Sequence, residues 1–116
     1  MYLKLKSKKI PIEIKTTLKE KIISFRFKLT DIDYGICFPK KRIINTYFYC
    51  QKVDIVMTDK DNNIVKIFLN EASEKRFKGP KKTYFTYVFK GNTLNDYKVL
   101  DHLNIISTKK EKEVLF

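Results

Sequence analysis

The chain has 116 residues, of which 43% are hydrophobic and 14% aromatic, so it is long enough for one packed domain and too short for two of ordinary size. No stretch approaches the roughly 20 apolar residues of a membrane helix, and the N-terminus lacks the apolar core of a signal peptide. We therefore expect a single cytoplasmic domain over residues 1–116, without a membrane span.

The formal net charge is +12, from 25 basic and 13 acidic residues. Three of the basic residues are Arg and the rest are Lys, whereas Arg is the preferred donor for bidentate phosphate and base contacts. The excess of positive charge, which comes mostly from Lys, can therefore reflect either an anionic partner or an AT-rich coding sequence. The candidate basic patch comprises Lys40, Lys41, Arg42, Lys81 and Lys82.

The N-terminal part predicts a hairpin followed by a helix. Residues 2–6 and 10–15 alternate apolar and polar side chains, which indicates two strands with one wet face each. Pro11 cannot donate to a ladder, so we expect its strand at a sheet edge or a bulge. Thr17 and Glu20 have the spacing of a capping box, which predicts a short helix over residues 18–24.

The middle and C-terminal parts predict further strands. Residues 36–38, 43–49 and 83–89 are β-prone, and 53–69 contains two apolar runs joined by an Asp and Asn cluster, as in a β-hairpin. We also expect a short helix near 93–98, a last strand over 103–106 and a flexible basic tail over 108–116. The predicted fold class is mainly β (β-rich α+β), a single antiparallel, partly closed or barrel-like twisted sheet with one or two short helices.

Three segments, Gly35–Pro39, Ile44–Phe48 and Val53–Asn62, resemble the uncharacterised protein family 0127, also called domain-of-unknown-function family 192. Their order and spacing match over about residues 17–69, within a family-like core of about 17–107. The resemblance implies a fold rather than a biochemical activity. Asn45 stands where the family often has His, and the family's first segment appears as Ser24–Lys28 without its Gly or Met.

Asp54 is a carboxylate near the start of an otherwise apolar strand, so it needs hydrogen bonds or a counter-charge there. One interpretation is that it only caps backbone amides of a preceding loop. The other groups it with Asn45, Thr46 and Arg26 as the polar floor of a small ligand-binding cleft. Both remain open at this stage.

The sequence shows no recognisable catalytic, metal or cofactor site. The turn at Asp59–Asn63 lacks the Gly and Glu positions of a calcium loop, and His102 is the one histidine. Cys37 and Cys50 fit no metal spacing and are expected to be buried packing residues. We expect no cofactor, and an enzyme acting through Asp54 is the least favoured class.

The leading functional hypothesis is a non-catalytic binding or accessory module with a shallow polar cleft. The alternative is binding to nucleic acid or an acidic surface through the Lys-rich ends of the chain. Cations beside stacking rings would come from Lys40–Arg42 near Tyr47–Tyr49, or from Lys78, Lys81 and Lys82 beside Tyr84, Phe85 and Tyr87. The partner stays open between these, and the chain is expected to be a monomer or a weak dimer.

Overall fold

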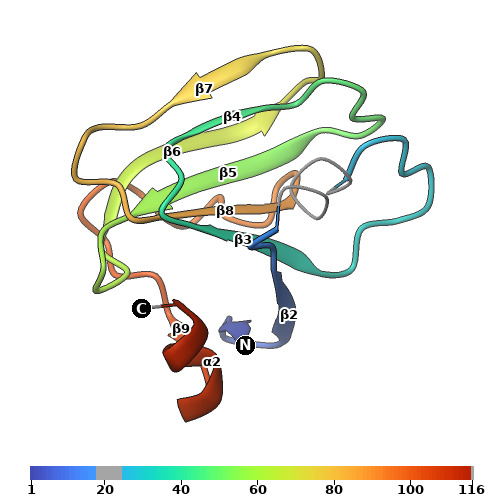
Figure 1. The fold of residues 1–116 in the computed structure, drawn as a ribbon. Helices are drawn as coiled ribbons and strands as arrows, with labels where there is room; N and C mark the ends of the chain where they lie inside the picture. The colour runs from blue at the N-terminus through green and yellow to red at the C-terminus, as the bar shows by residue number, and fades with distance from the viewer. Residues whose placement is uncertain (18–24, 116) are drawn as a thin grey trace.

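The computed structural model describes residues 1–17 and 25–115 of the chain. Most of its regular structure is strand, and the main sheet curls into a half-barrel (Figure 1). In chain order the elements are β1 (Tyr2–Lys4), β2 (Lys9–Ile14), β3 (Gly35–Pro39), β4 (Ile43–Asn45), β5 (Val53–Thr58), β6 (Ile64–Glu71), β7 (Arg76–Lys78), β8 (Phe85–Lys90), β9 (Ile105–Ile106) and α2 (Lys109–Leu115).

The main sheet has seven strands in the order β6-β5-β8-β3-β2-β1-β9, and β4 and β7 pair separately as a two-stranded sheet. The β-rich fold class is confirmed, but the expectation of a single antiparallel sheet is wrong. Strands β2 and β3 pair in parallel, with Ile12 opposite Gly35 and Ile14 opposite Cys37. A parallel pair needs a long crossover, which here is the connection 15–34.

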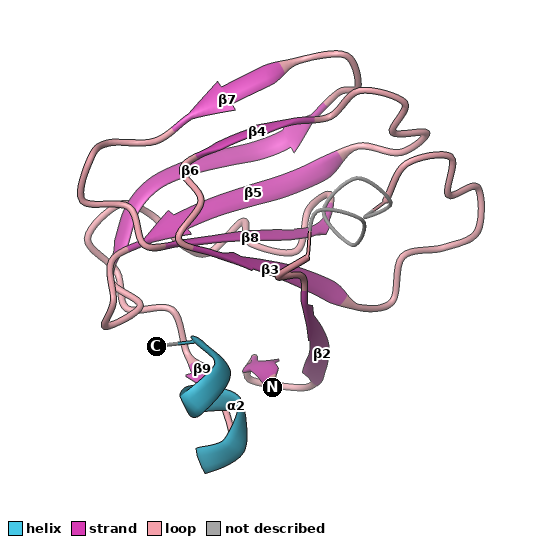
Figure 2. Cartoon of the chain, viewed as in Figure 1, coloured by secondary structure: helices cyan, strands magenta, loops and turns pink. Residues whose placement is uncertain are grey.

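Both faces of the central strands are buried, so their side chains alternate between two apolar layers. On β5, Val53, Ile55 and Met57 enter one layer and Val56 enters the other. The first layer lies beneath β4 and β7 and includes Ile44 and Phe77. The second layer is closed by side chains from β1, the 91–104 connection and α2, namely Leu3, Leu94, Leu103 and Leu115. Figure 2 shows the two-stranded sheet and the helix at opposite ends of the view.

The opening hairpin is confirmed, since β1 and β2 are antiparallel with Tyr2 opposite Pro11. The edge position expected from Pro11 is wrong, because β2 lies between β1 and β3. Only its second half, from Ile12 onward, pairs with β3. Pro11 thus lies just before the part of β2 that has neighbours on both sides, where its missing amide proton leaves no ladder bond unmade.

The central hairpin is confirmed as β5 and β6. The Asp59 carboxylate closes its turn by accepting hydrogen bonds from the amides of Asp61 (2.9 Å) and Asn63 (3.0 Å), and Asn62 takes a left-handed φ of 62°. These residues therefore form a turn held by a side chain rather than a metal loop.

The C-terminal residues include a helix that the sequence did not predict. Residues 109–115 form helix α2 instead of a frayed tail. Thr108 and Glu111 make a reciprocal capping box, in which each side chain accepts the other residue's amide at 3.2 and 2.9 Å. Residues 93–96 form bends and a turn, and 97–98 have no regular structure, so the second predicted helix is wrong. The helix expected over 18–24 lies outside the described residues.

Candidate nucleic-acid interface

Asp54 is fully buried, and both of its carboxylate oxygens accept backbone hydrogen bonds. One oxygen accepts the amides of Asn70 (2.7 Å) and Asn92 (3.2 Å), and the other accepts the amide of Leu94 (2.8 Å). These bonds tie the end of β6 and the connection after β8 to β5. The geometry corresponds to the capping interpretation, since the carboxylate is directed at amides within the protein.

Arg26 and Asn45 do come together. An Arg26 guanidinium nitrogen donates to the Asn45 side-chain oxygen at 2.9 Å and to the Tyr47 carbonyl at 2.6 Å. The same Asn45 oxygen accepts the amide of Tyr47 at 3.2 Å. The hollow beside them has a volume of about 20 Å³, enough for about one water, so this part of the predicted cleft has no room for an organic ligand.

Thr46 is buried and binds a neighbouring turn. Its hydroxyl donates to the Ala72 carbonyl at 2.9 Å and accepts the Lys75 amide at 3.1 Å. In the same turn, the Glu74 carboxylate accepts the Phe48 amide at 2.8 Å. Arg26, Asn45 and Thr46 thus fix the backbone of residues 45–48, while Asp54 binds a different set of amides.

Beside these bonds, three aromatic side chains are exposed to solvent, namely Phe27, Tyr47 and Phe48. We call this surface the aromatic corner. Phe27 is 70% exposed and Phe48 56%, and their rings stack with centroids 5.1 Å apart and planes 21° apart. The Phe27 amide donates to the Phe48 carbonyl at 2.8 Å. Both have left-handed backbones, with φ of 60° and 64°. Large side chains rarely adopt this conformation, which costs about 1–3 kcal/mol each and is typical of functional sites.

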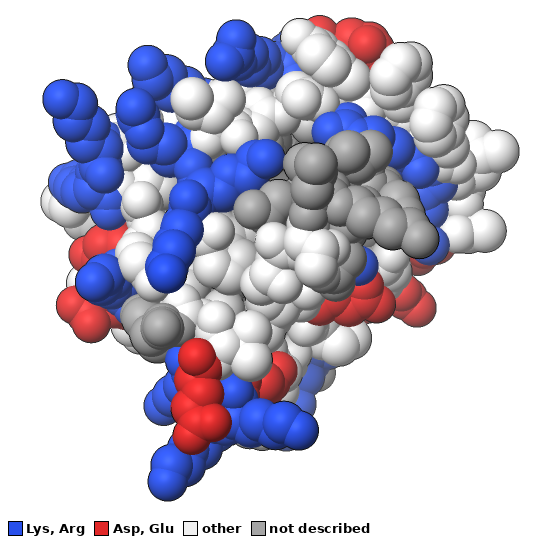
Figure 3. All heavy atoms as spheres, in the orientation of Figure 1, with Lys and Arg blue, Asp and Glu red and all other residues white. Residues whose placement is uncertain are grey.

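The predicted basic patch is also assembled, because the turn after β3 and the connection between β7 and β8 share hydrogen bonds. The Gly79 amide donates to the Arg42 carbonyl at 2.7 Å, and an Arg42 guanidinium nitrogen donates to the Gly79 carbonyl at 3.3 Å. We call this region the basic end. It comprises Lys40, Lys41, Arg42, Lys81 and Lys82, and in Figure 3 Lys and Arg side chains gather over the part of the molecule where β7 ends and β4 begins.

One charge of the basic end, that of Lys82, reaches Asp59 in the turn between β5 and β6. Desolvation raises the pKa of this carboxyl, but hydrogen bonds from Asn63 and Asp61, with the charge of Lys82, hold the pKa below its ordinary value. Lys60 lies over the Tyr84 ring, 5.2 Å from its centroid. The positive field thus extends from the basic end onto the turn between β5 and β6.

The basic end and the aromatic corner are connected through one strand. Lys41 and Arg26 line the same small hollow, one at each end of β4. Strand β4 has three residues and so spans about 10 Å. The Lys41 ammonium lies 5.8 Å from the centroid of Phe38, and the Arg26 guanidinium 5.7 Å from that of Tyr49. Cations therefore run from the basic end to the aromatic corner.

Sequence reasoning identified Tyr47 and Phe48 beside a basic segment but missed Phe27. In the run Phe25-Arg26-Phe27, a strand-like backbone would direct the two rings to the same side, so the pattern predicts that both are buried or both are exposed. Instead, Phe25 is buried beneath Tyr34 and Tyr49, and Phe27 is turned to solvent by its positive φ. The sequence pattern gave no sign of that reversal.

The two cysteines differ in environment. Cys37 lies in the second apolar layer, and burial raises the pKa of its thiol, with a hydrogen bond to Tyr87 acting in the opposite direction. Cys50 is exposed, so the expectation that both are packing residues is wrong for Cys50. Both are free thiols.

Within residues 1–17 and 25–115, no helix combines the length and the hydropathy that crossing a bilayer requires. Nor do these residues contain a group of three or more His, Cys, Asp or Glu side chains arranged to hold a metal ion.

The chain matches no protein-family model and no curated protein. Among solved structures, it is similar to a putative transcription regulator from Sinorhizobium meliloti, with a TM-score of 0.71, 13% identity and coverage of 88% of each chain. It is also similar to a protein of unknown function from Novosphingobium aromaticivorans, with a TM-score of 0.64, 16% identity and coverage of 78% of this chain and 71% of that one. At these identities the likeness shows a shared fold, and the resemblance to family 0127 stays a prediction.

Proposed function

We propose that this protein is a non-catalytic module that binds single-stranded nucleic acid along the path from the basic end to the aromatic corner. The observation that carries the proposal is the stacked, solvent-exposed pair of Phe27 and Phe48. Proteins that bind single strands combine a positively charged path for the backbone with aromatic rings on which bases stack. The described surface offers both components.

The aromatic corner supplies base stacking. A base stacked on a protein ring contributes about 1–3 kcal/mol and tolerates any sequence, because every base has a π face. Bonds from Arg26, Asn45 and Thr46 hold the loop that carries Phe48, so its ring is positioned before a ligand arrives. A preorganised surface loses less conformational entropy on binding.

The basic end supplies phosphate contacts. Its five cations come from two loops that are bonded to each other, and the flexible ammonium groups suit a backbone read as charge rather than as sequence. The predominance of Lys supports binding without base specificity. A protein of the same fold from Sinorhizobium meliloti is described as a putative transcription regulator, a role that would involve nucleic acid in that protein.

The polar-cleft hypothesis has less support from the geometry. Asp54 is occupied by three backbone amides, and Arg26 and Asn45 border a hollow of only about 20 Å³. These residues instead support the loops on which the aromatic corner and the connection after β8 depend. We assign them a positioning role in the proposed function.

The test is fluorescence anisotropy of a labelled single-stranded oligonucleotide at several salt concentrations. Five phosphate contacts predict that the logarithm of the association constant falls with the logarithm of salt with a slope of about −3.5. A Lys81→Gln/Lys82→Gln variant should reduce that slope by about 1.4. The matched control is Lys109→Gln/Lys110→Gln on α2, which should leave the slope unchanged.

Two outcomes would overturn the proposal. One is an affinity that does not change with salt. The other is equally tight binding of polyglutamate, which carries charge without bases and would reassign the surface to acidic proteins. Partner identity beyond this class, and the expected monomeric or weakly dimeric state, stay predictions.

A further inference from the structure

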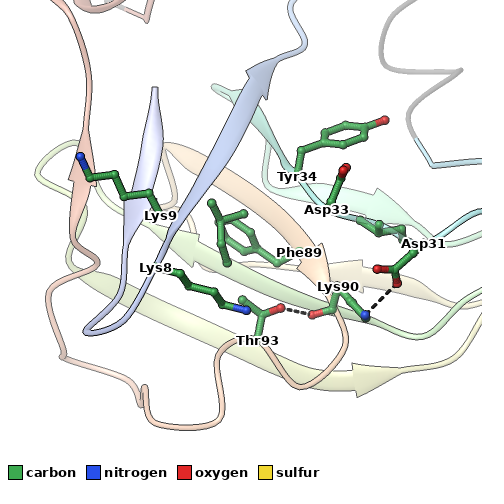
Figure 4. A pocket seen from close by; sticks show the side chains of 10 residues that line it. Lys8, Lys9, Asp31, Asp33, Tyr34, Phe89, Lys90 and Thr93 are labelled. Atoms are coloured by element: carbon green, nitrogen blue, oxygen red, sulfur yellow. Dashed lines mark hydrogen bonds and ion pairs between the residues drawn. The ribbon is translucent and has the colours of Figure 1, made fainter.

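A separate cavity of about 270 Å³ lies at the other end of β3 from the basic end (Figure 4). Three segments form it: residues 8–10 from the turn into β2, residues 31–34 before β3, and residues 89–93 at the end of β8. Because β2 and β3 are parallel and β8 is antiparallel to β3, the starts of β2 and β3 and the end of β8 meet at one edge of the sheet. The fold itself brings these segments together.

The floor of the cavity is apolar. It consists of Ile10, Ile32 and Phe89, of which Ile32 and Phe89 are buried. Gly35 makes this floor possible, because a Cβ at that position would lie 2.4 Å from the Cε1 atom of Phe89. Any larger residue would displace the ring that closes the bottom of the cavity.

The rim carries an asymmetric set of charges. The Lys90 ammonium pairs with the Asp31 carboxylate at 2.7 Å, and this hydrogen bond and charge lower the pKa of Asp31. Lys9 lies over the Tyr2 ring, 4.9 Å from its centroid. In Figure 4, Lys8 extends across the mouth of the cavity on the side of Lys90. Lys9 is directed away from the cavity, so Lys8 is the cation that reaches its mouth, beside the Lys90–Asp31 pair and Asp33 (Figure 4).

One wall of the cavity is fixed by Asp54. Its carboxylate binds the amides of Asn92 and Leu94, the residues on either side of Thr93, which lines the cavity. The Thr93 hydroxyl donates to the Lys90 carbonyl at 2.6 Å, which closes the turn (Figure 4). The buried carboxylate thus fixes one wall of the cavity from behind, without lining the cavity itself.

We propose that this cavity binds a small organic carboxylate with an apolar body. The Lys8 ammonium pairs with the carboxylate, and the apolar body lies on Ile10, Ile32 and Phe89. The volume is close to the lower end of the range for small-molecule sites, which combine apolar walls with a few polar groups. The single ammonium group of Lys8 suits a monoanion, since Asp31 and Asp33 would repel the second charge of a phosphate dianion.

The test is titration of the ¹⁵N-labelled protein with benzoate, followed by NMR. Benzoate should bind with a dissociation constant on the order of 1 mM and shift the amides of residues 8–10, 31–34 and 90–94. Neutral benzamide, which has the same shape, should bind at least about tenfold more weakly, and inorganic phosphate should not shift these amides at matched ionic strength. Lys8→Gln should weaken benzoate binding by a similar factor. The matched control is Lys6→Gln, in the same turn but outside this cavity. This variant should bind benzoate as tightly as the wild type does.

Equal binding of benzoate and benzamide would overturn the proposal, and so would benzoate shifts that appear only outside the three segments or not at all. Binding of phosphate as tight as that of benzoate would overturn the assigned ligand class. The site is independent of the proposed nucleic-acid surface. Lys8→Gln should therefore leave oligonucleotide binding unchanged, and the two proposals fail separately.

Discussion

The carboxylate of Asp54 accepts the backbone amide of Leu94 at 2.8 Å, joining two buried residues that are 40 positions apart in the sequence. With the amides of Asn70 and Asn92, it satisfies three donors around one point. The edge strand β6 and the connection from β8 to β9 are both attached to β5 through this carboxylate.

Asp54→Ala should therefore destabilise the protein by at least about 3 kcal/mol, because it leaves three buried or partly buried donors without an acceptor. Asp54→Asn keeps one acceptor oxygen, so its loss should be smaller. Urea unfolding followed by circular dichroism measures both. A loss below about 1 kcal/mol for the alanine variant would contradict the assigned role.

Glu111 couples the chain ends, because its carboxylate pairs with the N-terminal ammonium of Met1 and accepts the Thr108 amide. The hydrogen bond from the ammonium is the largest cause that holds the Glu111 pKa below its ordinary value. A carboxyl whose pKa is lowered on folding stabilises the fold above its unfolded pKa, and this contribution is lost as the pH falls through the lowered value.

An NMR titration of the Glu111 carboxyl should thus give a pKa below the ordinary glutamate range. Acetylation of the N-terminus removes the ammonium charge and should raise that pKa. Identical titration curves for the free and acetylated chains would show that the ion pair does not form in solution.

The two thiols should react at very different rates. Cys50 is exposed, whereas Cys37 is buried and burial raises the pKa of its thiol, so Cys37 presents little reactive thiolate. Under native conditions one thiol per chain should react rapidly with a disulfide reagent, and both should react in denaturant. Rapid reaction of Cys37 in the Cys50→Ser variant would contradict the buried position.

The strands with strong local patterns were predictable from the sequence. Alternation in residues 2–15 and the Asp and Asn cluster at 59–63 identified two hairpins, because both signals come from neighbouring residues. The parallel pairing of β2 with β3 was not predictable, since it depends on a crossover whose path no local pattern encodes. The Thr108 and Glu111 pair that starts α2 was a readable signal, but the many lysines around it suggested a tail.

The candidate site was predicted in part. Arg26 and Asn45 do meet, but they support a loop rather than border a cleft, because Tyr47 and Phe48 turn outward. Exposure of Phe27 depends on a single left-handed φ at a bulky residue, which sequence propensity disfavours. The cavity beside Lys8 combines residues from three distant segments, so only the tertiary structure reveals it.

The central claim is that bases stack on the aromatic corner, and the most direct test compares two ligands. Anisotropy titrations would use a single-stranded oligonucleotide and an abasic strand of the same length, with the wild-type protein and Phe27→Ala/Phe48→Ala. The wild type should bind the strand with bases at least about fivefold more tightly, as expected for one stacking contact of about 1 kcal/mol, and the variant should lose this preference while its salt dependence persists. Equal affinity of the wild type for both strands, or an undiminished preference in the variant, would contradict the account.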